Sequence, residues 1–222
     1  MPDIRAPAIR PALQFADLTQ ERDVATIGIW VFLATEMLFF GGLLTSYAVY
    51  RHMFADGFTE AARHTKLIIG TINTAVLLTS SFAMAVGVEA AERGMEENRR
   101  IVVFALTVTA ALGVAFLALK GLEYYQEYQE HLVPGSGFAF GPRYRGPAQL
   151  FFLLYFILTG LHGVHVTIGV GLVGSVAAMT RRGAFSTGYT TPIMIVGLYW
   201  HFVDVVWIFL YPLIYLVGRS TQ

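Results

Sequence analysis

A single carboxylate, Glu36, lies near the middle of a long apolar stretch that extends from residue 24 to residue 50. A charged carboxylate is costly in hydrocarbon, so we expect Glu36 to be protonated, hydrogen-bonded or next to water. In a functional interpretation it relays protons or contacts a ligand. In a structural interpretation it is a neutral carboxyl group that joins one helix to another. The residue type and its position favour neither interpretation over the other.

Two histidines, His162 and His165, lie in the sequence TGLHGVHV within another apolar stretch. A spacing of three residues places both on nearly the same face of a helix. Imidazole is a common ligand of metals and haem, but a metal site needs further ligands, and the chain has no cysteine to supply thiolates. The neighbouring glycines are typical of closely packed membrane helices, so the sequence favours hydrogen bonds between helices over metal binding.

His201 and Asp204 form a second pair with a spacing of three, in YWHFVDVVWIFLYP. The two side chains can pair with each other or reach a neighbouring helix. A buried carboxylate beside an imidazole could transfer protons, or the two could form a static pair that reduces the cost of burial. We favour the static pair, because structural pairs also perturb titration.

Acidic side chains and one histidine follow the third apolar stretch at helical spacing: Glu123, Glu127, Glu130 and His131. Carboxylates at this spacing can hold metal ions inside helical bundles. A solvated extension of a helix gives the same pattern. We favour the solvated extension, because a run of charges outside a membrane needs no other cause.

Two classes of function are not supported. Gly169, Gly171 and Gly174 spell G-x-G-x-x-G, but a dinucleotide fingerprint requires a preceding strand, whereas these glycines lie inside an apolar helix. Close packing between helices explains them better. The formal net charge is zero, with 15 basic and 15 acidic residues, so nothing indicates binding to nucleic acid.

The elements that position these side chains are predicted to be membrane-spanning helices. Only 14% of the 222 residues are charged, whereas a soluble domain carries about a quarter. A spanning helix needs about 20 mostly apolar residues, and five stretches of the sequence qualify. The apolar residues in these stretches are continuous rather than alternating, which favours helices over a barrel. The sequence therefore predicts an all-α integral membrane bundle of five transmembrane helices, at residues 24–50, 67–88, 101–119, 148–180 and 191–218.

The sequence is predicted to form one membrane domain after a polar tail. Residues 1–23 form the tail, which lacks the apolar core of a signal peptide, and residues 24–222 form the five-helix domain. Residues 51–66 are predicted as a mixed-charge loop, and the third helix is expected to continue to about residue 131. Basic residues divide eight to seven between the two sides, so charge does not define the orientation.

Four segments resemble, in order, the subunit III family of haem-copper respiratory oxidases. FLATEMLFFGG (32–42) resembles the family's Ser-Glu-x-Met-phenylalanine stretch, and GLEYYQEYQE (121–130) resembles its acidic aromatic stretch. FFLLYFILTGLHGVHVTIGV (151–170) and YWHFVDVVWIFLYPLIYLVG (199–218) resemble its last two helices. Longer family members have seven helices, and this chain starts at what resembles their third. The resemblance is therefore to the short five-helix bacterial form found in cytochrome c and quinol oxidases.

The resemblance implies a non-catalytic subunit III of a proton-pumping terminal oxidase that reduces oxygen to water. It implies no catalytic residue, metal or cofactor on this chain, with haem and copper in partner subunits and phospholipid bound to the surface. Subunit I is the expected main partner, with subunit II and small subunits as further neighbours. The expected location is the bacterial plasma (inner) membrane, with a cytoplasmic N-terminus and a periplasmic C-terminus.

The resemblance also gives roles to individual positions. Glu36 matches the family's buried, carbodiimide-reactive glutamate, and Arg181 with Arg182 matches a region that contacts anionic lipid head groups. The family's other polar intramembrane positions are matched by His162, His165, His201 and Asp204. Two other functions stay open: the accessory subunit of a bacterial nitric oxide reductase, which shares the fold, and an independent transporter or proton channel. The transporter is less favoured, because the sequence lacks paired inverted repeats.

Overall fold

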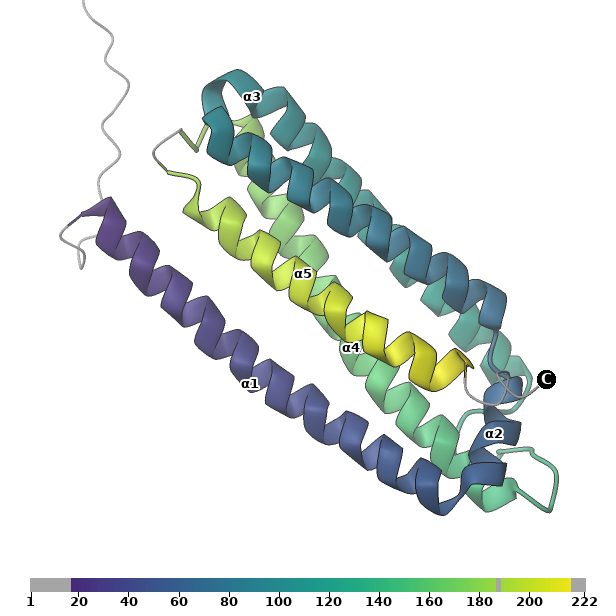
Figure 1. The fold of residues 1–222 in the computed structure, drawn as a ribbon. Coiled ribbons are helices and arrows are strands. Elements are labelled where there is room, and N and C mark those ends of the chain that lie inside the picture. Colours follow the sequence, from purple (N-terminus) through teal and green to yellow (C-terminus); the bar gives the residue numbers. More distant parts are fainter. Residues whose placement is uncertain (1–16, 187–188, 217–222) are drawn as a thin grey trace, which may run out of the picture.

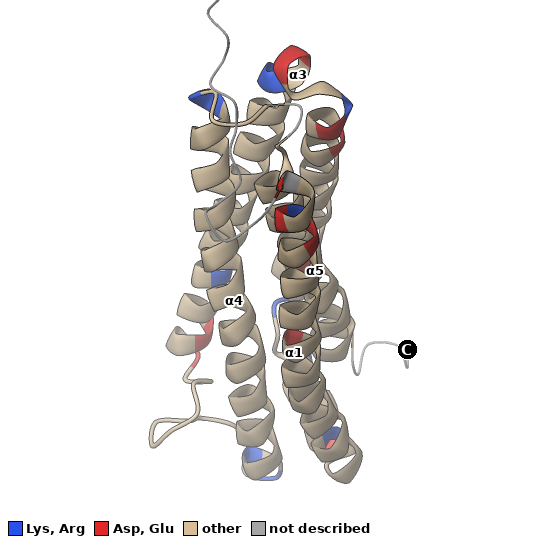
Figure 2. Cartoon of the chain, turned by 90° about the vertical axis from the view of Figure 1, so that its left-hand side faces the viewer, with Lys and Arg blue, Asp and Glu red and all other residues tan. Residues whose placement is uncertain are grey.

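A computed structural model describes residues 17–186 and 189–216, which form a bundle of long helices lying side by side (Figure 1). Four of the described helices are long and apolar enough to cross a membrane, and charged residues are sparse along their middle parts (Figure 2). The all-α prediction is confirmed. The elements in chain order are α1 (Leu18–Met53), α2 (Ala55–Arg63), α3 (Leu67–Gln129), α4 (Arg145–Arg181), α5 (Thr191–Tyr211) and the π-helical turn η1 (Pro212–Leu216).

Helix α3 is a hairpin of two helical arms that lie against each other (Figure 1). The arms meet at Gly94, whose φ of 154° lies in a region that glycine adopts at little cost. The Thr109 hydroxyl of the second arm donates to the Ser80 carbonyl oxygen of the first, at 3.3 Å. The two arms contain the predicted spans 67–88 and 101–119, so one continuous element carries two of the five predicted spans.

The helices extend beyond several predicted boundaries. Helix α1 begins at Leu18 rather than at residue 24, because the Asp17 side chain accepts a hydrogen bond from the Gln20 amide at 2.7 Å and caps the first turn. The predicted loop 51–66 is wrong in part, because it contains α2, whose apolar face is buried. Of the predicted tail and last span, residues 1–16 and 217–218 lie outside the described residues.

Trp200 of α5 is the centre of the packing between α5 and its neighbours. A Cβ atom added at Gly113 or Gly169 would lie 2.6 Å or 3.0 Å from the indole ring, so both glycines make room for it. The indole N–H donates to the Ser80 hydroxyl at 3.2 Å. Gly169 therefore serves close packing between helices, as the sequence predicted for the glycine motif that contains it.

Helix α1 lies at the edge of the bundle, and only 11% of its most apolar window is buried (Figure 1). Hydrogen bonds hold it at three heights. The Tyr189 hydroxyl donates to Glu21 at 3.3 Å near the Gly94 end, and the Tyr47 hydroxyl donates to the Leu213 carbonyl oxygen at 2.6 Å near the α2 end. Glu36 forms the third contact, between these two. The two ends of the bundle are named below by Gly94 and by α2.

Candidate functional site

Glu36 and His165 join α1 to α4 between the two ends of the bundle. His165 Nε2 lies 3.1 Å from Glu36 Oε2, and His165 Nδ1 lies 2.8 Å from the Leu161 carbonyl oxygen. A carbonyl oxygen can only accept, so Nδ1 carries a hydrogen. The Nε2 contact then needs one more proton, which belongs either to a Glu36 carboxylic acid or to a His165 imidazolium ion. The pair therefore holds one shared proton in either form.

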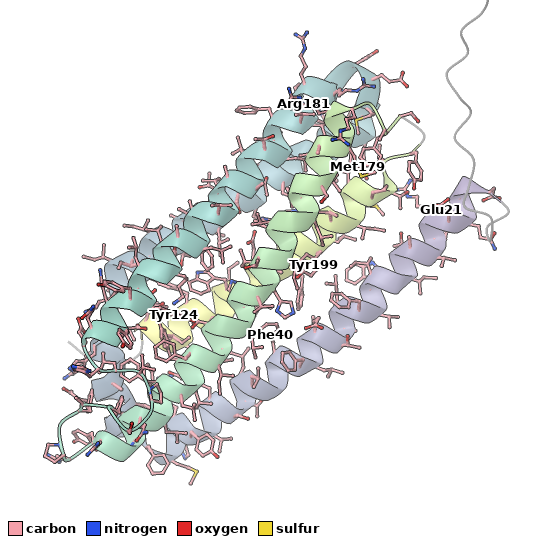
Figure 3. All side chains as sticks on the ribbon, turned by 180° about the vertical axis from the view of Figure 1, so that it is seen from behind. Glu21, Phe40, Tyr124, Met179, Arg181 and Tyr199 are labelled. Atoms are coloured by element: carbon pink, nitrogen blue, oxygen red, sulfur yellow. The ribbon has the colours of Figure 1, made fainter. Side chains whose placement is uncertain are left out.

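The surroundings of this pair come from three helices. Phe40 of α1 contacts the His165 ring edge-on, with the ring centroids 5.2 Å apart. The Tyr199 hydroxyl of α5 donates to the His165 backbone carbonyl oxygen at 3.0 Å (Figure 3). The Glu36 side chain is 20% exposed and that of His165 is 14% exposed. The site is thus enclosed by protein on one side and reaches the surface on the other.

His162 faces a different part of the bundle from His165. It is fully buried, with its ring centroid 5.6 Å from that of Phe116 on α3 and 5.1 Å from that of Trp207 on α5. Neither ring nitrogen has a hydrogen-bond partner among the described residues. The two histidines are about 60° apart around the helix, as their spacing implies, and this rotation is enough to direct them towards different neighbours.

His201 and Asp204 do not form the predicted static pair. No hydrogen bond joins them in the described chain; His201 Nδ1 instead lies 2.7 Å from the Ser81 hydroxyl of α3. Asp204 is 4% exposed, and neither of its carboxyl oxygens has a hydrogen-bond partner among the described residues. The pair prediction failed because a hydroxyl on the neighbouring helix supplies the polar partner of His201 that Asp204 was expected to supply.

A buried polar cluster occupies the interior at the α2 end, where the sequence predicted a solvated extension. Lys120 donates to Glu123 at 3.0 Å, and Tyr215 of η1 donates to the other oxygen of Glu123 at 2.7 Å. Glu123 and Glu127 are both fully buried, so the solvated extension is wrong for them. Glu130, which is 43% exposed and pairs with Lys66, and His131, which is also exposed, agree with that prediction.

The covering elements explain why this face of α3 is buried. Tyr155 of α4 and Tyr215 of η1 both lie over Lys120, with their hydroxyl oxygens 3.0 Å and 2.8 Å from its Nζ atom. Gly70 makes room for Tyr215, since a Cβ atom there would lie 2.9 Å from the tyrosine ring. The available sequence signal was a lysine directly after an apolar run, followed by a glutamate three residues later and by several tyrosines.

Arg181 and Arg182 lie at the Gly94 end, where α4 meets the second arm of α3 (Figure 3). They line a groove of about 640 Å³ whose walls are small and apolar side chains such as Val103 and Ala178. An adjoining groove of about 420 Å³ has Arg99, Arg100 and Arg181 along its rim. This geometry, with guanidinium groups beside apolar walls, suits an anionic head group with its acyl chains.

A metal site would need several histidine or carboxylate ligands close together. Within residues 17–186 and 189–216, no three His, Asp or Glu side chains come together in a way that could hold a metal ion. The polar groups are instead divided among the Glu36 contact, the Ser81 contact and the cluster around Lys120, and His162 lies apart from these among aromatic rings.

Comparison with known proteins identifies the family. The sequence model of the family "Cytochrome c oxidase subunit III" matches residues 17–219. The chain is 35% identical over 196 residues to cytochrome c oxidase subunit 3 of Synechocystis sp., covering 88% of this chain and 76% of that protein. It is 34% identical over 198 residues to the subunit of the same name from Thermostichus vulcanus, covering 89% of each. It is also 29% identical over 193 residues to quinol oxidase subunit 3 of Bacillus subtilis, covering 86% of each. The chain belongs to the cytochrome c oxidase subunit III family, the non-catalytic third subunits of respiratory terminal oxidases.

Proposed function

We propose that this chain is subunit III of a proton-pumping terminal oxidase that reduces oxygen to water, and that it stabilises subunit I and supports proton uptake. The observation that carries the proposal is the Glu36–His165 contact, which holds one proton between two helices while part of each side chain remains exposed. With this proton the pair has no net charge, and the partly exposed side chains give water access to the one unit of charge that appears when the pair gains or loses a proton. Subunit I is the main partner, and subunit II and small subunits are further neighbours.

Haem and copper belong to the partner subunits in this proposal, and this chain binds neither. The chain lies in the bacterial plasma (inner) membrane, with its N-terminus in the cytoplasm and its C-terminus in the periplasm. The Gly94 end then faces the cytoplasm and the α2 end faces the periplasm. Fusions of alkaline phosphatase to the α2 end and to the turn at Gly94 test this orientation, since only a periplasmic fusion is active.

Phospholipid is the proposed occupant of the two grooves at the Gly94 end. Arg181 and Arg182 contact the head group, and the apolar walls contact the acyl chains. Arg99 and Arg100 extend the basic rim across the groove. A membrane surface of anionic lipid attracts such a cluster by about 1 kcal/mol per basic residue.

Purification of the tagged chain tests the proposal as a whole. A complex with haem absorption, oxygen reduction and a large catalytic partner is the expected result. Recovery of an isolated homo-oligomer without haem would contradict it. Iron, copper and haem measured on the separated subunit then test whether this chain holds any of them.

A further inference from the structure

The cluster around Lys120 has no part in the function proposed above, and its hydrogen bonds are almost completely specified. Lys120 is 6% exposed and directs its three N–H groups to Glu123, Tyr155 and Tyr215. An ammonium group has three donors, so none is left over. Four aromatic ring centroids, including that of Trp207, lie between 4.7 Å and 5.5 Å from its Nζ atom. These contacts stabilise a charged lysine away from water.

Glu123 is the counter-ion of this lysine. One of its oxygens accepts from Lys120, and the other accepts from Tyr215. A carboxylate that accepts two hydrogen bonds, one of them charge-assisted, is satisfied as an anion. Lys120 and Glu123 therefore form a neutral, fully hydrogen-bonded pair in the interior.

Glu127 adds a second carboxyl group that this neutral pair does not balance. It is fully buried, and neither of its oxygens has a hydrogen-bond partner of good geometry among the described residues. The groups that act on it are Lys120 and Glu123 from α3, Tyr155 from α4, and Lys66 from the segment before α3. Lys66 is already paired with Glu130, so it does not supply a free counter-charge. An unpaired buried carboxylate costs several kcal/mol, and binding a proton removes that cost.

We propose that the Lys120–Glu123–Glu127 cluster is a proton-binding site, in which Glu127 is a neutral carboxylic acid that exchanges its proton with water at the α2 end. Glu130 is the C-cap of α3, three residues beyond Glu127 and about one helical turn from it. Glu130 lines a cavity of about 620 Å³ together with Glu60 and His64, which places water-accessible titratable groups next to the cluster. The charged groups of this site all come from the α3 segment, whereas Glu36 and His165 lie on α1 and α4.

The exchange step is a simple proton transfer. After Glu127 has released its proton, its carboxylate accepts another from a hydronium ion or from the carboxylic acid form of Glu130. The donor then becomes water or the Glu130 carboxylate. One O–H bond breaks and one forms, and no electrons are transferred. The ligand of the site is therefore the proton itself, and no metal ion or organic cofactor takes part.

Infrared difference spectroscopy of the purified oxidase tests the proposal, because a protonated carboxyl group has its own C=O stretching band. Subtracting the Glu127→Gln spectrum from that of the wild type is expected to leave one such band, which shifts in heavy water. The Glu36→Gln variant is the matched control and must keep this band. If the oxidase with Glu127→Gln does not assemble, Glu127→Asp provides the test. This variant keeps a carboxyl group, so the band is expected to move rather than disappear.

Two further variants separate the binding site from its exchange route. Lys120→Gln removes the ammonium group, so Glu123 also becomes protonated and a second carboxyl band appears. Glu130→Gln slows the shift of the Glu127 band in heavy water, whereas Glu89→Gln, at the Gly94 end, leaves it unchanged. The absence of any band that depends on residue 127 would overturn the proton site, and an unchanged exchange rate in Glu130→Gln would overturn the route.

Discussion

Replacing Lys120 by methionine removes the ammonium group from the α2 end while nearly keeping the length of the side chain. Glu123 then retains only its hydrogen bond from Tyr215, and without a counter-ion it can stay in the interior only by taking up a proton, at a cost in free energy. Breaking a buried ion pair by removing one partner costs about 3–5 kcal/mol. Since 1.4 kcal/mol is a factor of ten, this is about two to three and a half powers of ten in the equilibrium constant for unfolding.

A second substitution separates the charge effect from a simple loss of packing. Glu123→Gln in the Lys120→Met background leaves no buried charge, so we expect it to restore more than half of the lost stability. Lys66→Met is the matched control, because this lysine belongs to a partly exposed pair worth about 1 kcal/mol or less.

The assay follows the release of the tagged subunit from the purified oxidase as SDS is increased, and it compares the midpoints of the four proteins. A midpoint for Lys120→Met that equals that of the wild type would refute the reasoning about buried charge. A double variant as unstable as the single variant would show that the loss comes from packing and not from electrostatics.

Three further predictions follow from other contacts. Glu36→Gln is expected to keep the subunit bound, with modest changes in the initial rate of oxygen reduction. Glu36→Leu is expected to weaken helix packing by about 1–3 kcal/mol, because it leaves the histidine partner unsatisfied. Equal, near-complete loss of initial activity in both variants would contradict this prediction. Gly113→Ala places a methyl group 2.6 Å from neighbouring side chains, and such overpacking costs about 1–3 kcal/mol in a thermal release assay. Gly121→Ala, with no atom within 4 Å, should have no such effect. Arg181→Gln is expected to lower the phospholipid that co-purifies, measured by mass spectrometry, and Arg143→Gln at the α2 end is not.

The fold was largely predictable from the sequence, because long apolar runs admit few structures in a membrane. The partner of Glu36 was also within reach of prediction, since a mid-membrane carboxyl group requires a polar neighbour and the fourth span offered two histidines. Their different directions were not predictable, because the arrangement of helices around α4 decides which neighbour each histidine meets.

The cluster around Lys120 shows why the rest of the site was missed. Glutamates at helical spacing have the same pattern whether water or another helix covers them. Tyr155 of α4 and Tyr215 of η1 cover them here, and Tyr215, which bonds to Glu123, is 92 residues away from it in the sequence. Contacts of such long range depend on how α5 ends, and local periodicity carries no information about that.

The hydrogen bonds at three heights along α1 determine its position in the bundle. Lipid tails are as apolar as the neighbouring side chains, so sliding or rotating an edge helix changes its apolar contacts little. A displacement of one residue, however, moves a helix by about 1.5 Å and turns it by about 100°. Such a step would break the contacts of Glu21, Glu36 and Tyr47 together. Helix α1 therefore has one discrete register, selected by polar contacts at three depths, where apolar packing alone would allow a continuum.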